Sequence, residues 1–199
     1  KFSFVNPTQI HFGQGQIARI TSAIPRDARV LLLYGGGSIK RNGVYEQAVS
    51  ALEGFTWQEF AGVEPNPTVE TLNRAVEQVK AEGLSYILAV GGGSVIDGAK
   101  YVAAAACYDG DGWDILLGKH RVAEALPIGA VLTLPATGSE SNGGSVVTKA
   151  ATQEKLNFVL HAHTHTRTHR HTHTNSHTQR TPSCALRPAV VHPGPAANL

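Results

Sequence analysis

Two short glycine-rich segments of this 199-residue chain contain the residue types that bind phosphate groups. One is YGGGS at residues 34–38, the other is VGGGS at residues 90–94, and each follows an apolar run. Glycines let the backbone approach a ligand closely, and the free N–H groups of a helix start attract an anion. The two segments therefore predict a phosphate site, although a purely structural turn would use the same residues.

A third segment, LTLPATGSES at residues 132–141, is rich in small hydroxyl side chains. Thr133, Thr137 and Ser139 would supply hydroxyl groups around a ribose or a ring amide, or they would only cap turns and helices. Asp97 lies one helical turn beyond Ser94, where it would orient the glycine turn or face a ligand. Alternatively, it is only a first-turn acid that the helix dipole stabilises. Three such turns meeting at one sheet edge favour a nucleotide site.

The elements that must position these residues follow from apolar patterning. Strands are predicted at 2–5, 9–12, 29–34, 56–60, 86–90, 127–134, 145–149 and 155–160, the last two as a hairpin-like pair. Helices are predicted at 13–20, 39–52 and 94–107, with a short segment around 113–117, and a further helix begins at Asn66 or Thr68 and ends at Gly83. Alternation of strands and helices from 29 to 134 predicts an α/β fold, a Rossmann-like mainly parallel sheet with helices on both faces. The carboxyl ends of its strands then share one edge, where ligands bind.

The composition of the chain argues against nucleic acid and membranes as binding partners. The chain is 42% hydrophobic with a formal charge of +2, and its basic residues form no stripe that would predict nucleic-acid binding. No apolar run approaches the roughly 20 residues that span a bilayer, so we expect a cytoplasmic protein without a membrane segment. Cys107 and Cys184 give no disulfide or metal pattern. A small molecule is the expected partner.

The composition changes near Phe158, which divides the chain into a domain at 1–158 and a tail at 159–199. Histidine and threonine alternate at 161–178, and the tail is predicted to be disordered. Dense imidazoles bind metal ions from solution, but a catalytic centre needs fixed geometry. Since CA-repeat DNA reads as alternating His and Thr codons, we interpret the tail as a frameshift, retained intron or gene-model error.

Four motifs in combination carry a family resemblance: YGGGSIKRNGV, GVEPNPT, ILAVGGGSVIDGAKYVAAAA and LTLPATGSESNGGSVVT, followed by Lys155. They resemble the N-terminal half of the iron-containing (type III) alcohol dehydrogenase family, in its NADPH-dependent aldehyde reductase and butanol dehydrogenase branch. The resemblance covers residues 2 to about 158 and implies a dehydroquinate synthase-like N-terminal domain. In that family a helical C-terminal half holds divalent iron or zinc through one aspartate and three histidines, and no such half is recognisable here.

The resemblance also implies roles for individual residues. The cofactor-binding set comprises Gly36, Gly37, Ser38 and Asn66 by the adenosine ribose, Gly92, Gly93, Ser94 and Asp97 by the pyrophosphate, Thr133, Thr137 and Ser139 along the middle, and Lys155 at the nicotinamide ribose. NAD-preferring relatives tend to carry an acid where this chain has Ser38, and Lys40 and Arg41 are close by. We therefore expect NADP(H) to be preferred over NAD(H).

The function implied is a metal-requiring oxidoreductase that interconverts primary alcohols and aldehydes, present as its cofactor-binding half and, for lack of metal ligands, inactive by itself. A homodimer is one assembly that the resemblance allows. Two alternatives stay open: a truncated nucleotide-binding module without catalysis, and a histidine-rich protein that sequesters metal ions.

Overall fold

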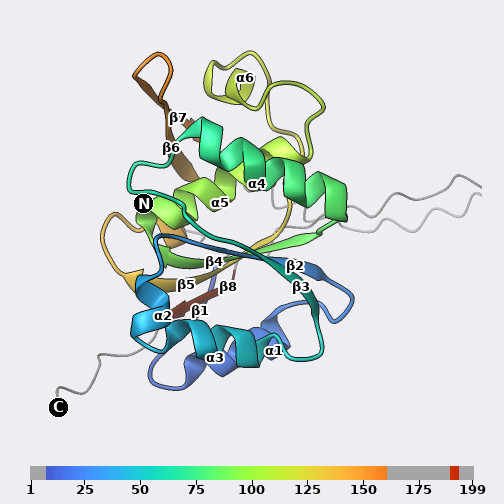
Figure 1. Ribbon diagram of the computed structural model, residues 1–199, viewed down its shortest axis with the longest axis vertical. Helices are drawn as coiled ribbons and strands as arrows, with labels where there is room; N and C mark the ends of the chain where they lie inside the picture. Colours follow the sequence, from blue (N-terminus) through green and yellow to red (C-terminus); the bar gives the residue numbers. More distant parts are fainter. Residues whose placement is uncertain (1–7, 161–188, 193–199) are drawn as a thin grey trace, which may run out of the picture.

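The structure, a computed structural model, describes residues 8–160 and 189–192 (Figure 1). Its centre is a six-stranded sheet in the order β1-β8-β5-β4-β2-β3, in which every neighbouring pair runs parallel. The strands are β1 (Gln9–Phe12), β2 (Arg29–Tyr34), β3 (Thr56–Phe60), β4 (Tyr86–Gly92), β5 (Ile128–Leu134) and β8 (Ala189–His192). The predicted α/β fold with a mainly parallel sheet is confirmed.

Helices cover both faces of this sheet, because the central strands are apolar on both sides. One face carries η1 (Gln16–Arg19), α1 (Ile20–Ala23), α2 (Ser38–Arg41) and α3 (Val44–Ala51). The other carries α4 (Val69–Glu82) and α5 (Gly93–Ala106), with α6 (Trp113–Leu116) beyond them. Leu31 and Leu33 of β2 belong to the core under α4 and α5, whereas Val30 and Leu32 belong to the opposite core.

Local signals explain the limits of α4. The Thr68 side chain accepts a hydrogen bond from the N–H of Thr71 at 3.3 Å, which makes Thr68 the N-cap. Gly83 ends the helix in the left-handed region with φ 59°. Both residues are among the boundaries that the sequence predicts.

The helix predicted at 39–52 is interrupted. Asn42 and Gly43 separate α2 from α3, because Gly43 takes a φ of 74° and the Asn42 side chain accepts a hydrogen bond from the N–H of Val44 at 3.2 Å. The result is a very short α2 directly after the first glycine turn.

The tail contributes one strand, which differs from the disorder predicted for 159–199. Residues Ala189–His192 form β8, inserted between β1 and β5 with parallel backbone pairing on both sides. The sequence AVVH contains two β-branched valines, which favour a strand. The histidine-rich segment and the strand predicted at 2–5 lie outside the described residues.

A separate antiparallel hairpin, β6 (Gly144–Lys149) and β7 (Glu154–Val159), packs against α5. It confirms the predicted pair, and the N–H of Thr148 also donates to the carbonyl of Pro67 at 2.9 Å. Within the described part of the chain, no helix is both long and apolar enough to span a membrane.

Candidate dinucleotide site

The three predicted turns lie at one edge of the sheet. β2, β4 and β5 are neighbours and run parallel, so their carboxyl ends meet there. Tyr34 is in register with Val90, and Gly92 with Leu134. The first glycine turn, the second glycine turn and the hydroxyl-rich segment therefore follow three adjacent strand ends, as predicted.

The second glycine turn joins β4 to α5 without an intervening loop. Gly92 is the N-cap in an extended conformation, and α5 then runs for 14 residues with no acidic residue in its first turn and no side-chain cap. The first N–H groups of this helix are thus left without an intrahelical partner and face the carboxyl edge. This is an arrangement that attracts a phosphate.

The hydroxyl-rich segment packs directly on this turn. A Cβ placed on Gly93 would lie 3.3 Å from Ser139 Oγ and 3.8 Å from Thr137 Oγ1. These two hydroxyls are themselves 3.2 Å apart. The structure thus brings Gly93, Thr137 and Ser139 together, while Thr133 lies within β5 and is half-buried.

Two further predicted residues, Asn66 and Lys155, meet beside Ser94. Asn66, in the left-handed region with φ 55°, donates its N–H to Ser94 Oγ at 3.4 Å. Lys155 of β7 donates its Nζ to Asn66 Oδ1 at 2.7 Å. Residues far apart in sequence are therefore connected at the entrance to α5, with Lys155 and Asn66 exposed to solvent.

The first glycine turn is more open. Nothing lies within 4 Å of a Cβ placed on Gly36 or Gly37, and Gly37 has φ 92°. Ser38, the first residue of α2, is exposed. A ligand can approach this backbone without displacing any side chain.

A cluster of charged and aromatic side chains lies next to Ser38. Lys40 Nζ is 4.4 Å from the ring centre of Tyr45 and 5.2 Å from that of Tyr34, within cation–π range. Both tyrosine hydroxyls donate to Glu59 Oε2, Tyr45 at 2.8 Å and Tyr34 at 3.0 Å. The interaction with Tyr34 is the main cause that raises the pKa of Lys40 above its ordinary value.

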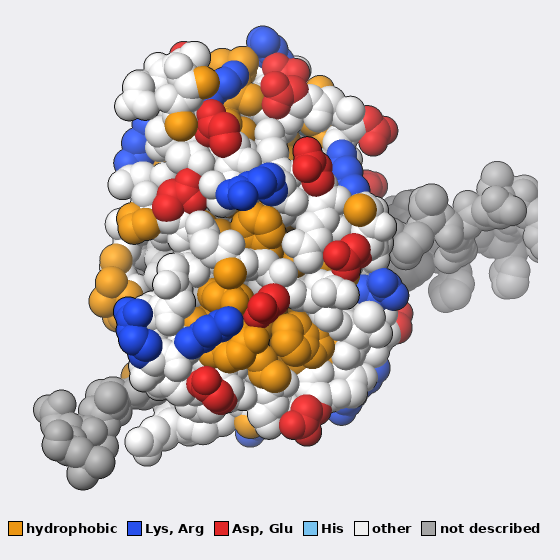
Figure 2. All heavy atoms as spheres, in the orientation of Figure 1, with side chains coloured by type: hydrophobic (Ala, Val, Ile, Leu, Met, Phe, Trp, Pro, Cys, Tyr) orange, Lys and Arg blue, Asp and Glu red, His pale blue; other side chains and the backbone are white. Residues whose placement is uncertain are grey.

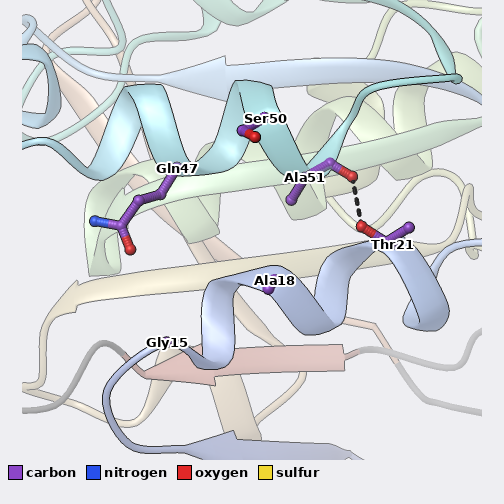
Figure 3. A pocket seen from close by; sticks show the side chains of 6 residues that line it. All are labelled: Gly15, Ala18, Thr21, Gln47, Ser50 and Ala51. Carbon is purple, nitrogen blue, oxygen red and sulfur yellow. Dashed lines mark hydrogen bonds between the residues drawn. The ribbon is translucent and has the colours of Figure 1, made fainter.

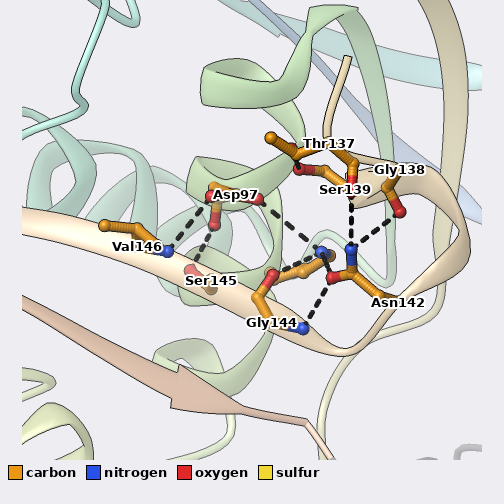
Figure 4. A network of polar contacts seen from close by, with 9 residues as sticks. Asp97, Thr137, Gly138, Ser139, Asn142, Gly144, Ser145 and Val146 are labelled. Carbon is orange, nitrogen blue, oxygen red and sulfur yellow. Dashed lines mark hydrogen bonds and ion pairs between the residues drawn. The ribbon is translucent and has the colours of Figure 1, made fainter. Parts of the chain in front are cut away.

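Asp97 contacts the hairpin β6–β7, a role that was not among those predicted for it. Its Oδ2 accepts the N–H of Val146 at 3.2 Å, and its backbone carbonyl accepts Ser145 Oγ at 2.7 Å (Figure 4). Its Oδ1 lies 3.7 Å from Lys100 Nζ, an ion pair rather than a hydrogen bond. Asp97 thus holds the hairpin β6–β7 against α5.

Two residues of this region, Lys100 and Asn142, were missed by the sequence reasoning. Lys100 is only 5% exposed and its ammonium donates to Asn142 Oδ1 at 3.3 Å. The available signal was a lysine within the small and apolar residues of 95–106, where a surface-facing helix would show more polar positions.

A groove of about 300 Å³ lies elsewhere, between the η1–α1 segment and α3 (Figure 3). It is lined by Gly15, Ala18, Thr21, Gln47, Ser50 and Ala51. Thr21 Oγ1 donates to the carbonyl of Ala51 at 2.9 Å across it. None of the predicted site residues lines this groove.

Figure 2 shows Lys and Arg interspersed with Asp and Glu on the visible face, with apolar patches between them. Across residues 8–160 and 189–192, no group of three or more His, Cys, Asp or Glu side chains is arranged to hold a metal ion. The residues at the sheet edge, in contrast, fit a dinucleotide: an open glycine backbone, a helix N-terminus, hydroxyls and a lysine.

Known proteins resemble this chain in sequence. The chain is 53% identical over 157 residues to the probable NADH-dependent butanol dehydrogenase 1 of Bacillus subtilis, and 51% identical over 160 residues to the NADPH-dependent aldehyde reductase YqhD of Escherichia coli. These matches cover 77% and 79% of this chain, but only 41% of each relative. The chain therefore spans about two fifths of the length of the relatives it matches.

Solved structures of similar proteins have the same fold as this chain. The crystal structure of NADH-dependent butanol dehydrogenase A from Thermotoga maritima superposes on this chain with a TM-score of 0.80 and 43% sequence identity. The match covers 98% of this chain and 44% of that protein chain. E. coli YqhD matches with a TM-score of 0.79 and 43% identity, covering 96% and 45%. The family model for iron-containing alcohol dehydrogenases matches residues 7–168. With motifs, fold and relatives in agreement, this chain belongs to the iron-containing alcohol dehydrogenase family.

Proposed function

We propose that the chain binds NADP(H) at the carboxyl edge of its sheet, as the cofactor-binding part of an oxidoreductase that interconverts primary alcohols and aldehydes. The observation that carries the proposal is the convergence of the turns on the N-terminus of α5. Gly93 lies against Thr137 and Ser139, and Ser94 is joined through Asn66 to Lys155. Such a set of donors around a helix start fits a pyrophosphate with a ribose on each side.

Each part of the site has a separate task in this proposal. When bound, the nicotinamide ring supplies or accepts the hydride. The N–H groups at the start of α5 hold the pyrophosphate, with Gly92, Gly93 and Ser94 allowing close approach. Thr137 and Ser139 donate hydroxyls along the middle of the cofactor, and Lys155, which is hydrogen-bonded to Asn66 beside Ser94, offers its ammonium group to the cofactor from the hairpin. Gly36, Gly37 and Ser38 border the adenosine ribose.

The preference for NADP(H) rests on the surroundings of Ser38. The names of the relatives include both NADH and NADPH, so likeness alone does not decide the cofactor. Ser38 itself is not an acid that would repel a 2′-phosphate, and Lys40 is two residues further along α2, although the nearby Glu59 carboxylate offsets part of the lysine's charge. An anion at the 2′ position is therefore favoured electrostatically.

Direct titration of the 199-residue chain tests this proposal. We expect NADPH to bind at least tenfold more tightly than NADH, and Ser38→Asp to reverse the order because its carboxylate repels the phosphate and accepts ribose hydroxyls. Arg121→Ala is a control remote from Ser38 in sequence. Equal affinity for NADH and NADPH in the wild-type chain would refute the preference, and no binding of either would refute the site.

Catalysis needs a further measurement. The metal that polarises the substrate oxygen belongs, by family resemblance, to ligands beyond the described residues. NADPH oxidation with butanal and added Fe²⁺ or Zn²⁺ separates an enzyme from a binding module. We expect binding without turnover from this chain by itself, and turnover would contradict that part of the proposal.

A further inference from the structure

The proposed cofactor site leaves unexplained a buried lysine beneath it. Lys100 is on α5, is 5% exposed, and donates from its Nζ to the carbonyl of Gly144 and to Asn142 Oδ1. Desolvation lowers the pKa of Lys100, and the carboxylate of Asp97, 3.7 Å away, partly opposes this, with a weaker contribution from Glu140. Burying an ammonium group is costly unless it is well paired. A helix of small residues does not require a cation at this position.

Asn142 connects this ammonium to the hydroxyl-rich loop. Its Oδ1 accepts from Lys100 and from the N–H of Gly144 at 2.9 Å. Its Nδ2 donates to the carbonyl of Gly138 at 2.8 Å and to that of Thr137 at 3.4 Å. Figure 4 shows the side chain lying between the start of β6 and this loop. Both ends of the amide are thus used, one toward α5 and one toward the loop.

The loop that Asn142 holds carries the hydroxyls proposed for the cofactor. Thr137 Oγ1 and Ser139 Oγ are 3.2 Å apart, and Ser139 is only 6% exposed. Ser139 Oγ would touch a Cβ on Gly93, the first residue of α5. The height of the loop above the helix start is therefore set by hydrogen bonds from Asn142, whose own orientation is set by Lys100 together with the N–H of Gly144.

We propose that Lys100 is a positioning residue for the dinucleotide: through Asn142 it holds the loop at 137–139 over the N-terminus of α5, so that the pyrophosphate half of the cofactor is bound and the adenosine half is unaffected. This inference rests on the function proposed above. It makes a spatial prediction that general stabilisation does not make. The first glycine turn has no hydrogen bond to Lys100 or Asn142 among the described contacts, so only ligands that reach the loop should respond.

The test compares whole and half ligands on the 199-residue chain. NADPH reaches both turns, whereas 2′-AMP contains the adenosine and its 2′-phosphate but neither phosphate of the pyrophosphate; NADH and adenosine form the matching pair without the 2′-phosphate. Lys100→Met removes the ammonium at similar length. Asn142→Asp keeps an oxygen for Lys100 but loses the Nδ2 donors to the loop, and its new carboxylate pairs with the buried cation. Lys119→Met is the matched control, because Lys119 pairs with Asp114 at 3.1 Å with its side chain 65% exposed.

We expect Lys100→Met and Asn142→Asp to weaken the whole dinucleotide at least tenfold and to change the half ligand less than twofold, with Lys119→Met like wild type. Asn142→Asp gives the answer if Lys100→Met does not fold, and thermal melting of each variant reports on folding. Equal weakening of whole and half ligands, or unchanged dinucleotide affinity in a folded Asn142→Asp, would overturn the positioning role while leaving the proposed function intact. If the wild-type chain binds no member of either pair, the proposed function fails and the inference fails with it.

Discussion

The two GGGS turns share four letters but need their glycines for different reasons. In the first turn, Gly37 adopts φ 92° and nothing lies within 4 Å of the Cβ it lacks. In the second, residues 91–93 avoid the left-handed region, but a Cβ on Gly91 would lie 2.6 Å from Val95 Cγ2. Gly37 of the first turn therefore needs to be glycine for its backbone conformation, and Gly91 of the second for close packing.

The helices that follow the two turns, α2 and α5, also differ from each other. α2 has four residues and its Ser38 and Lys40 are exposed, whereas α5 has 14 residues and is buried between α4 and the hairpin β6–β7. A helix of several turns presents a full set of aligned N–H groups at its start. The second turn is thus suited to hold a phosphate, and the first to discriminate a ribose.

The largest effect should come from filling the crowded turn. Gly91→Ala places a methyl group against Val95 inside a packed core, and we expect it to lower the free energy of unfolding by about 3 kcal/mol. Urea denaturation measures this. The double variant Gly91→Ala/Val95→Ala should lose less stability than the sum of the single changes, because the clash is removed. Strict additivity would contradict the packing explanation.

The next effect concerns the ligand rather than stability. Gly93→Ala pushes against Ser139 Oγ, a side-chain atom that can shift by a few tenths of an ångström. We expect NADPH affinity to fall about tenfold, equivalent to about 1.4 kcal/mol, because the loop hydroxyls move from the helix start. Gly36→Ala, which meets nothing within 4 Å, is the matched change in the other turn. A larger loss of affinity from Gly36→Ala would reverse the assignment of the phosphate to the second turn.

Conformational strain should give a smaller loss. Gly37→Ala forces a methylated residue to φ 92°, which we expect to cost about 1 kcal/mol of stability. Gly37→Asn should recover part of this, since asparagine tolerates the left-handed region better. Thermal or urea unfolding of the two variants decides the point: if alanine and asparagine behave alike, backbone conformation is not what the first turn requires.

Much of the fold follows from the sequence because its signals are local. The run RVLLLY predicts β2, and Thr68 and Gly83 delimit α4 by capping. The three turns could be placed at one edge because parallel strands share their carboxyl end. The strand β8 was not predicted, since four residues in a low-complexity tail acquire their role only by pairing with β1 and β5.

The site was less predictable than the fold, since its contacts are not local. A helical lysine is ordinarily a surface residue, and Lys100 is buried only because Asn142 and Gly144 arrive from more than 40 positions along the chain. The same holds for Asp97. Its position in the sequence is that of a first-turn acid, but its carboxylate accepts a hydrogen bond from the N–H of Val146 in the hairpin. Turn glycines are recognisable from spacing, whereas the residues that fix a loop over them depend on the tertiary fold.

The smallest expected effect concerns the pH dependence of stability that the Glu59 carboxyl contributes beside the first turn. Near the first turn, the hydrogen bond from Tyr45 is the main cause that lowers the pKa of the Glu59 carboxyl, assisted by Tyr34 and Lys40. A carboxyl whose pKa is lowered by folding contributes stability above its ordinary pKa, and this contribution is lost as the pH falls through the lowered value. Tyr45→Phe removes the hydrogen bond, so wild type should exceed the variant in stability at pH 6 by a few tenths of a kcal/mol more than at pH 3, an amount kept small by solvent. Urea unfolding at both pH values measures the difference. A difference between wild type and Tyr45→Phe that is the same at both pH values would rule out Glu59 as its source.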